Sequence, residues 1–156
     1  DEELSALADD VFMYFGLGCR SVSKLYLPRG YDFNRMGEAF QKYADIINHN
    51  KYNNNYSYQY AVMGMNKIEH VNFGHLLLTE KKDLNSPIGV LHFEYYDDIK
   101  TVENELVQNA ENIQCIVAKR KFSENCVNFG ETQKPNIYNF ADNIDTIKFI
   151  TGLCRK

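Results

Sequence analysis

The sequence predicts an α/β fold of three layers, in which a mostly parallel sheet is flanked by helices. Stretches with helical spacing alternate with short apolar stretches along the whole chain, which is typical of parallel strands joined by helices. The 156 residues are enough for one domain with a substantial core, and 44% of them are hydrophobic. We therefore expect residues 1–156 to form a single domain.

The clearest helical pattern covers residues 1–15. Apolar side chains recur there at the spacing of one helix face, and three acidic residues in the first turn suit the positive end of the helix dipole. Gly16 and Gly18 are expected to end this helix, because glycine adopts the left-handed conformation that often follows a helix. The apolar run over 22–27 then predicts a strand, which Pro28 closes.

The next third of the chain combines one clear helix with an unusual polar segment. Asp32 is the expected N-cap of a helix that continues to about Asn48. The segment 48–60 is rich in Asn and Tyr and has no apolar period, so we interpret it as an exposed turn, because asparagine tolerates left-handed backbone. A polar, aromatic binding surface is the alternative. A further helix is expected to begin near Ser57.

The second half of the chain continues the alternation of strands and helices. The run over 89–96 is too continuously apolar for a strand with one face in solvent. In order, the expected elements are a strand over 75–79, a turn over 83–87, a strand over 89–96, a helix capped by Asp98, a strand over 114–118, a loop at 128–130 and a final helix carrying Phe140, Ile144, Ile147 and Ile150.

Charge and hydropathy disfavour several classes of protein. The chain has 17 Lys and Arg against 21 Asp and Glu, a formal net charge of −4, and no basic block stands out, so we expect no nucleic-acid partner. The apolar runs are short and interrupted by charge, so we expect no membrane span. No histidine and cysteine spacing resembles a metal site, so we expect no metal.

The ends of the chain and its few cysteines bear on its origin. The first residue is Asp1 rather than methionine, which favours a domain of a longer or processed protein. No secretion signal is visible, and four cysteines in a chain with an ordinary core are typical of a reducing compartment. We therefore expect a cytoplasmic location.

Cys19 is the main candidate for a reactive side chain. It follows two glycines and precedes Arg20, and a neighbouring cation favours the nucleophilic thiolate form of a cysteine. The free backbone N–H groups of such a turn also stabilise an oxyanion. Gly18 and Arg20 are therefore candidates for oxyanion stabilisation and thiol activation. The alternative is a cysteine that fills space beside a glycine turn, because free cysteine is often buried.

The remaining cysteines and the histidines have weaker claims to chemistry. Cys115 is expected in the core, inside an apolar strand, and Cys126 in a polar loop, while Cys154 lies near the chain end without a visible helper. His92 is the histidine best placed to reach the Cys19 thiol, because it lies in an expected strand of a sheet that could end near Cys19. A hydrogen-bonded core histidine is the alternative for this residue.

Several segments resemble a known enzyme superfamily. The stretch GCRSVSKLYL, residues 18–27, resembles the catalytic-cysteine segment of aldehyde dehydrogenases, in which a Gly-x-Cys turn precedes Ser-Arg or Ser-Lys and a strand. SPIGVL at 86–91 and NFG at 128–130 resemble later elements of the same domain. The resemblance is closer to LuxC-type acyl-CoA reductases. It covers nearly the whole chain through DDVFMYFGLGCRSVSKLYLP, INHNKYNNNYSY, SPIGVLHFEYYDD and DNIDTIKFI.

This resemblance implies the C-terminal, cysteine-bearing domain of a two-domain enzyme whose N-terminal domain carries most of the NADPH site. It implies that Cys19 attacks a fatty acyl-CoA, expelling CoA, and that NADPH reduces the acyl-enzyme to an aldehyde. Phe129, Gly130 and His92 become candidates for the substrate pocket. The resemblance also implies a homo-oligomer, and a domain that is inactive when isolated.

Two other functions stay open at this point. One is an NAD(P)-dependent aldehyde dehydrogenase that works in the oxidative direction. Oxidising relatives usually carry a glutamate just before a Phe-Gly-Pro element, and the corresponding stretch 83–87 has none, which favours a reductase. The other is a non-catalytic domain that binds acyl groups or mediates oligomerisation.

Overall fold

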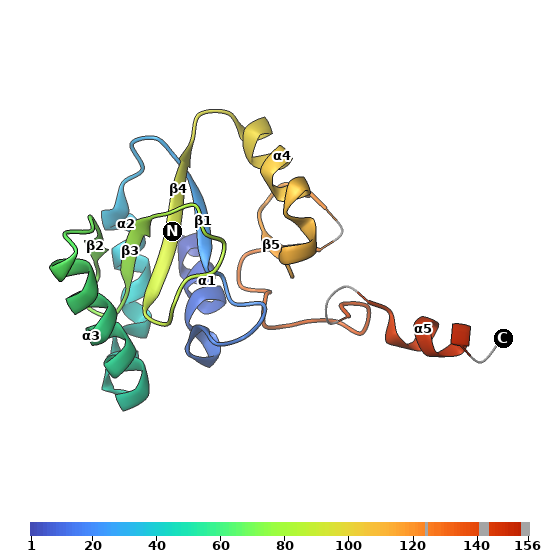
Figure 1. Ribbon diagram of the computed structural model, residues 1–156, viewed down its shortest axis with the longest axis horizontal. Helices are drawn as coiled ribbons and strands as arrows, with labels where there is room; N and C mark the ends of the chain where they lie inside the picture. Colours follow the sequence, from blue (N-terminus) through green and yellow to red (C-terminus); the bar gives the residue numbers. More distant parts are fainter. Residues whose placement is uncertain (124, 141–143, 154–156) are drawn as a thin grey trace.

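The computed structural model describes residues 1–123, 125–140 and 144–153. Its centre is a four-stranded sheet with the strand order β1-β4-β3-β2, in which only β2 is antiparallel to its neighbour (Figure 1). This confirms the prediction of a mostly parallel sheet flanked by helices. The strands are β1 (Lys24–Pro28), β2 (Val71–Asn72), β3 (Leu77–Glu80) and β4 (Val90–Tyr96).

The main core lies between one face of the sheet and two helices, α1 (Glu2–Phe12) and α2 (Phe33–Phe40). Alternate strand residues point to this face, because successive side chains of a strand point to opposite sides. Leu25 is paired with Phe93, and Leu78 with Leu91, and all four belong to this core. The helices contribute Leu7, Ala8, Val11, Phe12, Met36 and Phe40.

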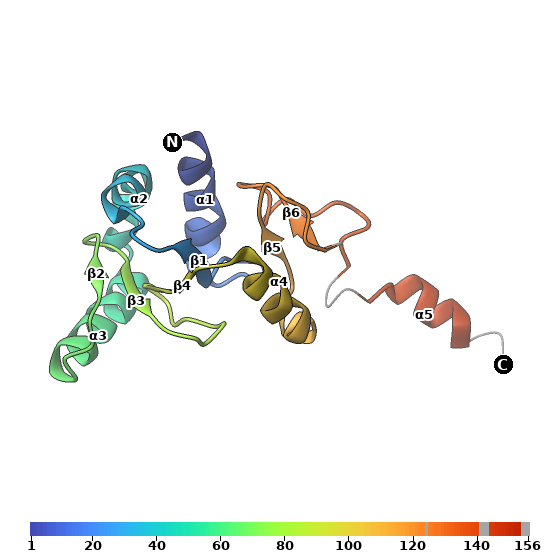
Figure 2. The same ribbon diagram turned by 90° about the horizontal axis from the view of Figure 1, so that it is seen from above.

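The opposite face carries α3 (Asn50–Met65) and α4 (Ile99–Gln108), so helices cover both faces of the sheet (Figure 2). Met63 of α3 packs on Leu77 and Val90 in a second apolar cluster. On the β1 side, the Tyr26 hydroxyl donates a 2.8 Å hydrogen bond to Glu105 of α4.

Both predicted helix caps are confirmed. The Asp32 carboxylate accepts a 2.9 Å hydrogen bond from the Asn34 backbone N–H, and Asp98 accepts one of 3.1 Å from Lys100. Each aspartate satisfies an N–H group in the first helical turn that has no partner inside the helix.

The first helix ends earlier than predicted. It stops at Phe12, and a 3₁₀ turn, η1 (Met13–Gly16), follows. The φ angles of Tyr14, Phe15 and Gly16 are 56°, 61° and 69°, so three successive left-handed residues reverse the chain toward β1. Gly18 does not have a positive φ. Phe15 leaves the apolar stripe and packs its ring against His49, with centroids 4.3 Å apart.

The prediction of an exposed turn over 48–60 is wrong, because α3 covers most of this segment after the 3₁₀ helix η2 (Gln41–Asn48). Tyrosine, rather than aliphatic residues, supplies much of the buried face of α3. Tyr52 is buried, and its hydroxyl donates a 2.9 Å hydrogen bond to the His75 carbonyl oxygen. Tyr56 and Met63 continue that face at helical spacing.

The C-terminal third is less regular than predicted. After the 3₁₀ turn η3 (Ala110–Asn112), β5 (Ile116–Val117) pairs with β6 (Cys126–Val127) in a separate parallel ladder. Cys115 is half-buried ahead of β5 rather than in a core strand, and Cys126 lies in β6 rather than in a loop. The last helix, α5 (Thr146–Leu153), begins after Phe140 and Ile144 and extends away from the sheet (Figure 1). Cys154 lies outside the described residues.

Candidate functional site

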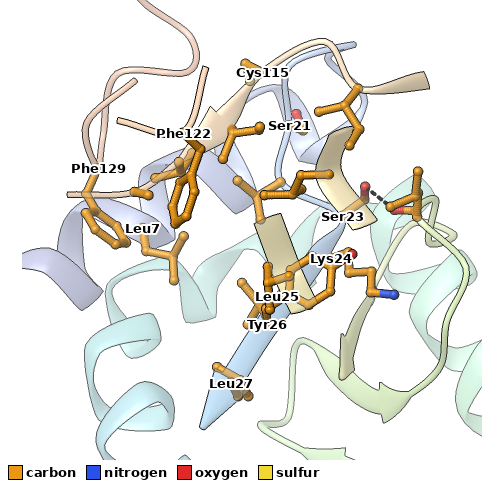
Figure 3. Close-up of a pocket in the computed structure, with 18 of the residues that line it drawn as sticks. Leu7, Ser21, Ser23, Lys24, Leu25, Tyr26, Leu27, Cys115, Phe122 and Phe129 are labelled. Carbon is orange, nitrogen blue, oxygen red and sulfur yellow. Dashed lines mark hydrogen bonds between the residues drawn. The ribbon is translucent and has the colours of Figure 1, made fainter. Parts of the chain in front are cut away.

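A cleft of about 630 Å³ separates the sheet from the C-terminal segment, and Cys19 and Arg20 are among its lining residues. Its walls are mainly apolar. In Figure 3, Leu7 of α1 lies close to Phe122 and Phe129, while Leu25 and Leu27 of β1 line the part farther from Cys115. A cleft with such walls suits an aliphatic chain.

Cys19 lies in a tight turn at this cleft and is exposed. The turn is closed by a 2.9 Å hydrogen bond from the Ser21 N–H to the Gly18 carbonyl oxygen. Gly18 leaves room for two neighbouring side chains, because an added Cβ would lie in tight contact, 3.1 Å from both the Gln133 side-chain amide and Ser21 Oγ. Gly18 therefore lets a neighbouring loop approach the turn closely, although it does not line the cleft itself.

Arg20 joins the Cys19 turn to the loop that follows β6. Its Nε donates a 2.6 Å hydrogen bond to the Thr132 carbonyl oxygen. On the other side, Cys115 Sγ lies 3.6 Å from the Arg20 carbonyl oxygen. Burial raises the pKa of the Cys115 thiol, so this cysteine stays protonated and is the poorer nucleophile.

Asp10 fixes the same loop onto α1. This side chain is 1% exposed, and its Oδ2 accepts a 2.7 Å hydrogen bond from the Gly130 N–H. Its Oδ1 accepts two more from Thr132. Gly130 has a φ of 79°, and an added Cβ would lie 3.2 Å from the Ala6 Cβ, so the loop backbone rests directly on the helix. Sequence reasoning missed Asp10, whose only signal is a charged residue beside the apolar stripe of α1.

The structure brings together some predicted site residues and separates others. Cys19, Arg20 and Phe129 line the cleft, whereas Gly130 faces α1 and does not. His92 is buried in β4, outside the cleft, and its Nδ1 donates a 3.0 Å hydrogen bond to the Asp83 carbonyl oxygen. Burial lowers the pKa of His92, which keeps its ring neutral.

Sequence reasoning also missed a partly buried ion cluster at the cleft. The Lys24 side chain is 4% exposed, and its Nζ lies 2.8 Å from Glu94 and 3.8 Å from Glu105. The Lys82 carbonyl oxygen accepts a further 2.6 Å hydrogen bond from the same Nζ. Burial, followed by the hydrogen bond to Glu105, raises the pKa of Tyr26 far above its usual range. The only sign of this cluster in the sequence is Lys24 itself, a charged residue next to Leu25 at the start of an apolar strand.

The N-termini of α2 and α4 do not fit the phosphates of a dinucleotide cofactor. Phosphates of such cofactors bind at helix N-termini that follow a glycine-rich turn. In this chain, α2 and α4 begin directly after Asp32 and Asp98, whose carboxylates each accept one N–H group of the first turn and would repel a phosphate. Within the same residues, no group of three histidine, cysteine or acidic side chains is arranged to hold a metal ion.

The chain matches no protein-family model, no curated protein and no solved structure. The resemblance to acyl-CoA reductases therefore stays a prediction. In the part of the chain that the structure describes, no helix has both the length and the apolar character needed to cross a membrane.

Proposed function

We propose that Cys19 accepts an acyl group from a fatty acyl-CoA, as the first half of a reduction to the aldehyde. The observation that carries this proposal is the exposed Cys19 thiol in a tight turn at the edge of a mainly apolar cleft. The thiol can meet a thioester from solvent while the acyl chain lies against apolar side chains. The resemblance of residues 18–27 to a catalytic-cysteine segment points to the same chemistry.

In the proposed step, the Cys19 thiolate attacks the thioester carbonyl carbon. A new carbon–sulfur bond forms, the bond to the CoA sulfur breaks, and the proton from the Cys19 thiol goes to the departing CoA thiolate. Arg20 is the nearest cation in sequence, and of its guanidinium nitrogens only Nε is hydrogen-bonded to another described residue. Its remaining N–H groups can stabilise the negative charge on the thiolate or on the carbonyl oxygen.

The second half of the reaction needs a hydride donor. Since the N-termini of α2 and α4 do not fit dinucleotide phosphates, we derive no hydride-transfer step from this chain. We propose that NADPH is bound mainly by a separate domain, and that this chain alone becomes acylated without releasing an aldehyde. An aldehyde dehydrogenase working in the oxidative direction would use the same thiol, but with an aldehyde as its substrate.

Intact mass spectrometry after incubation with dodecanoyl-CoA tests the acylation. We expect one added acyl group, which Cys19→Ser abolishes and Cys154→Ser, the matched loss of another thiol, leaves in place. An adduct of equal yield on Cys19→Ser would overturn the proposal. Binding of dodecanoyl-CoA without any adduct would instead support the second candidate, a non-catalytic acyl-binding domain, which the apolar cleft also favours.

A further inference from the structure

A second, polar pocket of about 330 Å³ adjoins the apolar cleft. The two are neighbours, because Ala118 and Lys119 line both of them. The lining of the second pocket includes three lysines, which are Lys119, Lys121 and Lys134, but only one acidic residue, Glu131. This excess of positive charge stands out in a chain with a formal net charge of −4.

The lysine charges in this pocket are only partly neutralised by the protein. Lys121 and Lys134 form no ion pair with any residue that the structure describes, although Lys134 is within electrostatic range of Asp9 on α1. Lys119 lies 2.5 Å from Glu3, in an exposed pair of the kind that contributes little stability. Glu131 is held inside the pocket, because its Oε2 accepts hydrogen bonds from the backbone and side-chain amides of Asn128, another lining residue, and its charge offsets only one of the three lysines. The pocket therefore favours an anion with several charges.

The cysteines show how closely the two pockets are placed. Cys115 lines the apolar cleft and Cys126 lines the basic pocket. The pKa of Cys115 is raised mainly by burial, and negative charge at Cys19 or at Cys126 would raise it further. Cys115 is thus close enough to interact electrostatically with both Cys19 and Cys126. One extended ligand can occupy the cleft and the basic pocket together.

We propose that the basic pocket binds the phosphates of the CoA nucleotide while the acyl chain occupies the apolar cleft. This inference rests on the proposed function, since it assumes that the thioester lies at Cys19. The 3′-phosphate and the diphosphate of CoA match a site with several ammonium groups, and asparagine amides beside them suit the ribose and the adenine. A phosphorylated dinucleotide such as NADPH carries similar groups, so the test must separate the two.

The experiment compares Lys121→Glu/Lys134→Glu with a matched charge reversal, Lys51→Glu/Lys148→Glu, on helices that line neither pocket. Calorimetry measures the Kd of free CoA and of NADPH for each variant. Single-turnover acylation is measured with dodecanoyl-CoA and with S-dodecanoyl-N-acetylcysteamine, a thioester that lacks the nucleotide. Urea unfolding midpoints establish that both variants are folded.

We expect the pocket variant to weaken CoA binding by at least about tenfold, because each lysine contributes a charge-assisted hydrogen bond. The dodecanoyl-CoA concentration that gives half-maximal acylation rate should rise by a similar factor in this variant. Acylation by the nucleotide-free thioester should not change. An unchanged Kd for CoA would overturn the inference. Loss of NADPH binding alone would overturn the choice of ligand. If neither thioester acylates Cys19 but CoA binding is lost in the pocket variant, the pocket stands and the proposed function fails.

Discussion

One carboxylate oxygen of Asp10 accepts two hydrogen bonds from Thr132, which lies 122 positions later in the chain. The Thr132 backbone N–H is 3.0 Å from Oδ1 and its hydroxyl is 2.9 Å from the same atom. The Thr132 carbonyl oxygen accepts the Arg20 Nε. A buried group of α1 is thereby connected through one loop to the residue next to Cys19.

We expect Asp10→Asn to destabilise the protein by about 3 kcal/mol. The asparagine amide group would face N–H donors, so at least one of Gly130 and Thr132 would lose its buried acceptor. The free energy of unfolding from urea titration measures this effect. Asp45→Asn, a similar change at an exposed position, is the control. Equal stability of the two variants would show that the Asp10 hydrogen bonds contribute nothing.

Gly89→Ala should be more destabilising than Gly74→Ala. Both glycines have a positive φ, 78° and 85°, so both substitutions meet the strain of the left-handed region, roughly 1 kcal/mol. At Gly89, however, the new Cβ would lie 2.9 Å from the Tyr56 Cα, whereas nothing lies within 4 Å at Gly74. We expect about 3 kcal/mol for Gly89→Ala, by comparison with overpacked cores. Similar urea midpoints for the two variants would contradict close packing of α3 on the start of β4.

The contrast between these features explains what the sequence could predict. The caps at Asp32 and Asp98 were predicted because each carboxylate binds an N–H group only two residues away. The strand over 89–96 was predicted because its first half is buried on both faces, which leaves the adjacent apolar residues Val90 and Leu91. Such signals are local, and a single sequence contains them in full.

The missed features depend on partners that are distant in the sequence. Asp10 meets Thr132 only because the chain after β6 returns to α1, and nothing near Asp10 marks that return. Lys24 and Glu94 are 70 positions apart and become neighbours only through the pairing of β1 with β4. The candidate site was therefore predicted at Cys19, Arg20 and Phe129, while the residues that fix its loops were not.

Lys24→Met should destabilise the fold through the carboxylates that it leaves behind. Glu94, whose side chain is 23% exposed, would lose its 2.8 Å ion pair, and Glu105 would lose a nearby cation. We expect a loss of about 2 kcal/mol, because an uncompensated, partly buried charge is costly. The double variant Lys24→Met/Glu94→Gln should recover part of it, and urea unfolding of the four combinations gives the coupling energy. No recovery would mean that the lysine stabilises through its aliphatic stem alone.

Stability should decrease as the pH falls below about 6.5, the ordinary pKa of histidine. Burial lowers the pKa of His92 in the folded state, so the unfolded chain binds the proton more readily. The stabilising contribution is therefore complete above the unfolded pKa and is lost as the pH falls toward the folded one. Burial also lowers the pKa of His75, so this histidine contributes to the same pH dependence. Urea midpoints between about pH 5 and 8 should give a slope that His92→Gln reduces and His49→Gln, at an exposed position, does not. A slope unchanged by His92→Gln would contradict this assignment.

Alkylation by iodoacetamide should distinguish the two cysteines beside Arg20. Cys19 is exposed, whereas Cys115 is half-buried, and burial raises the pKa of its thiol. Only the thiolate reacts, so we expect Cys19 to be modified at least about tenfold faster near neutral pH. Peptide mass spectrometry at successive times measures both rates in one sample.

Thr132→Val, which keeps the carbonyl that binds Arg20, should preserve this ratio. Arg20→Ala should slow the modification of Cys115, because burial raises the pKa of this thiol and the Arg20 charge that opposes this effect is removed. Equal rates for the two cysteines in the unmodified sequence would contradict the placement of Cys115 behind the Cys19 turn.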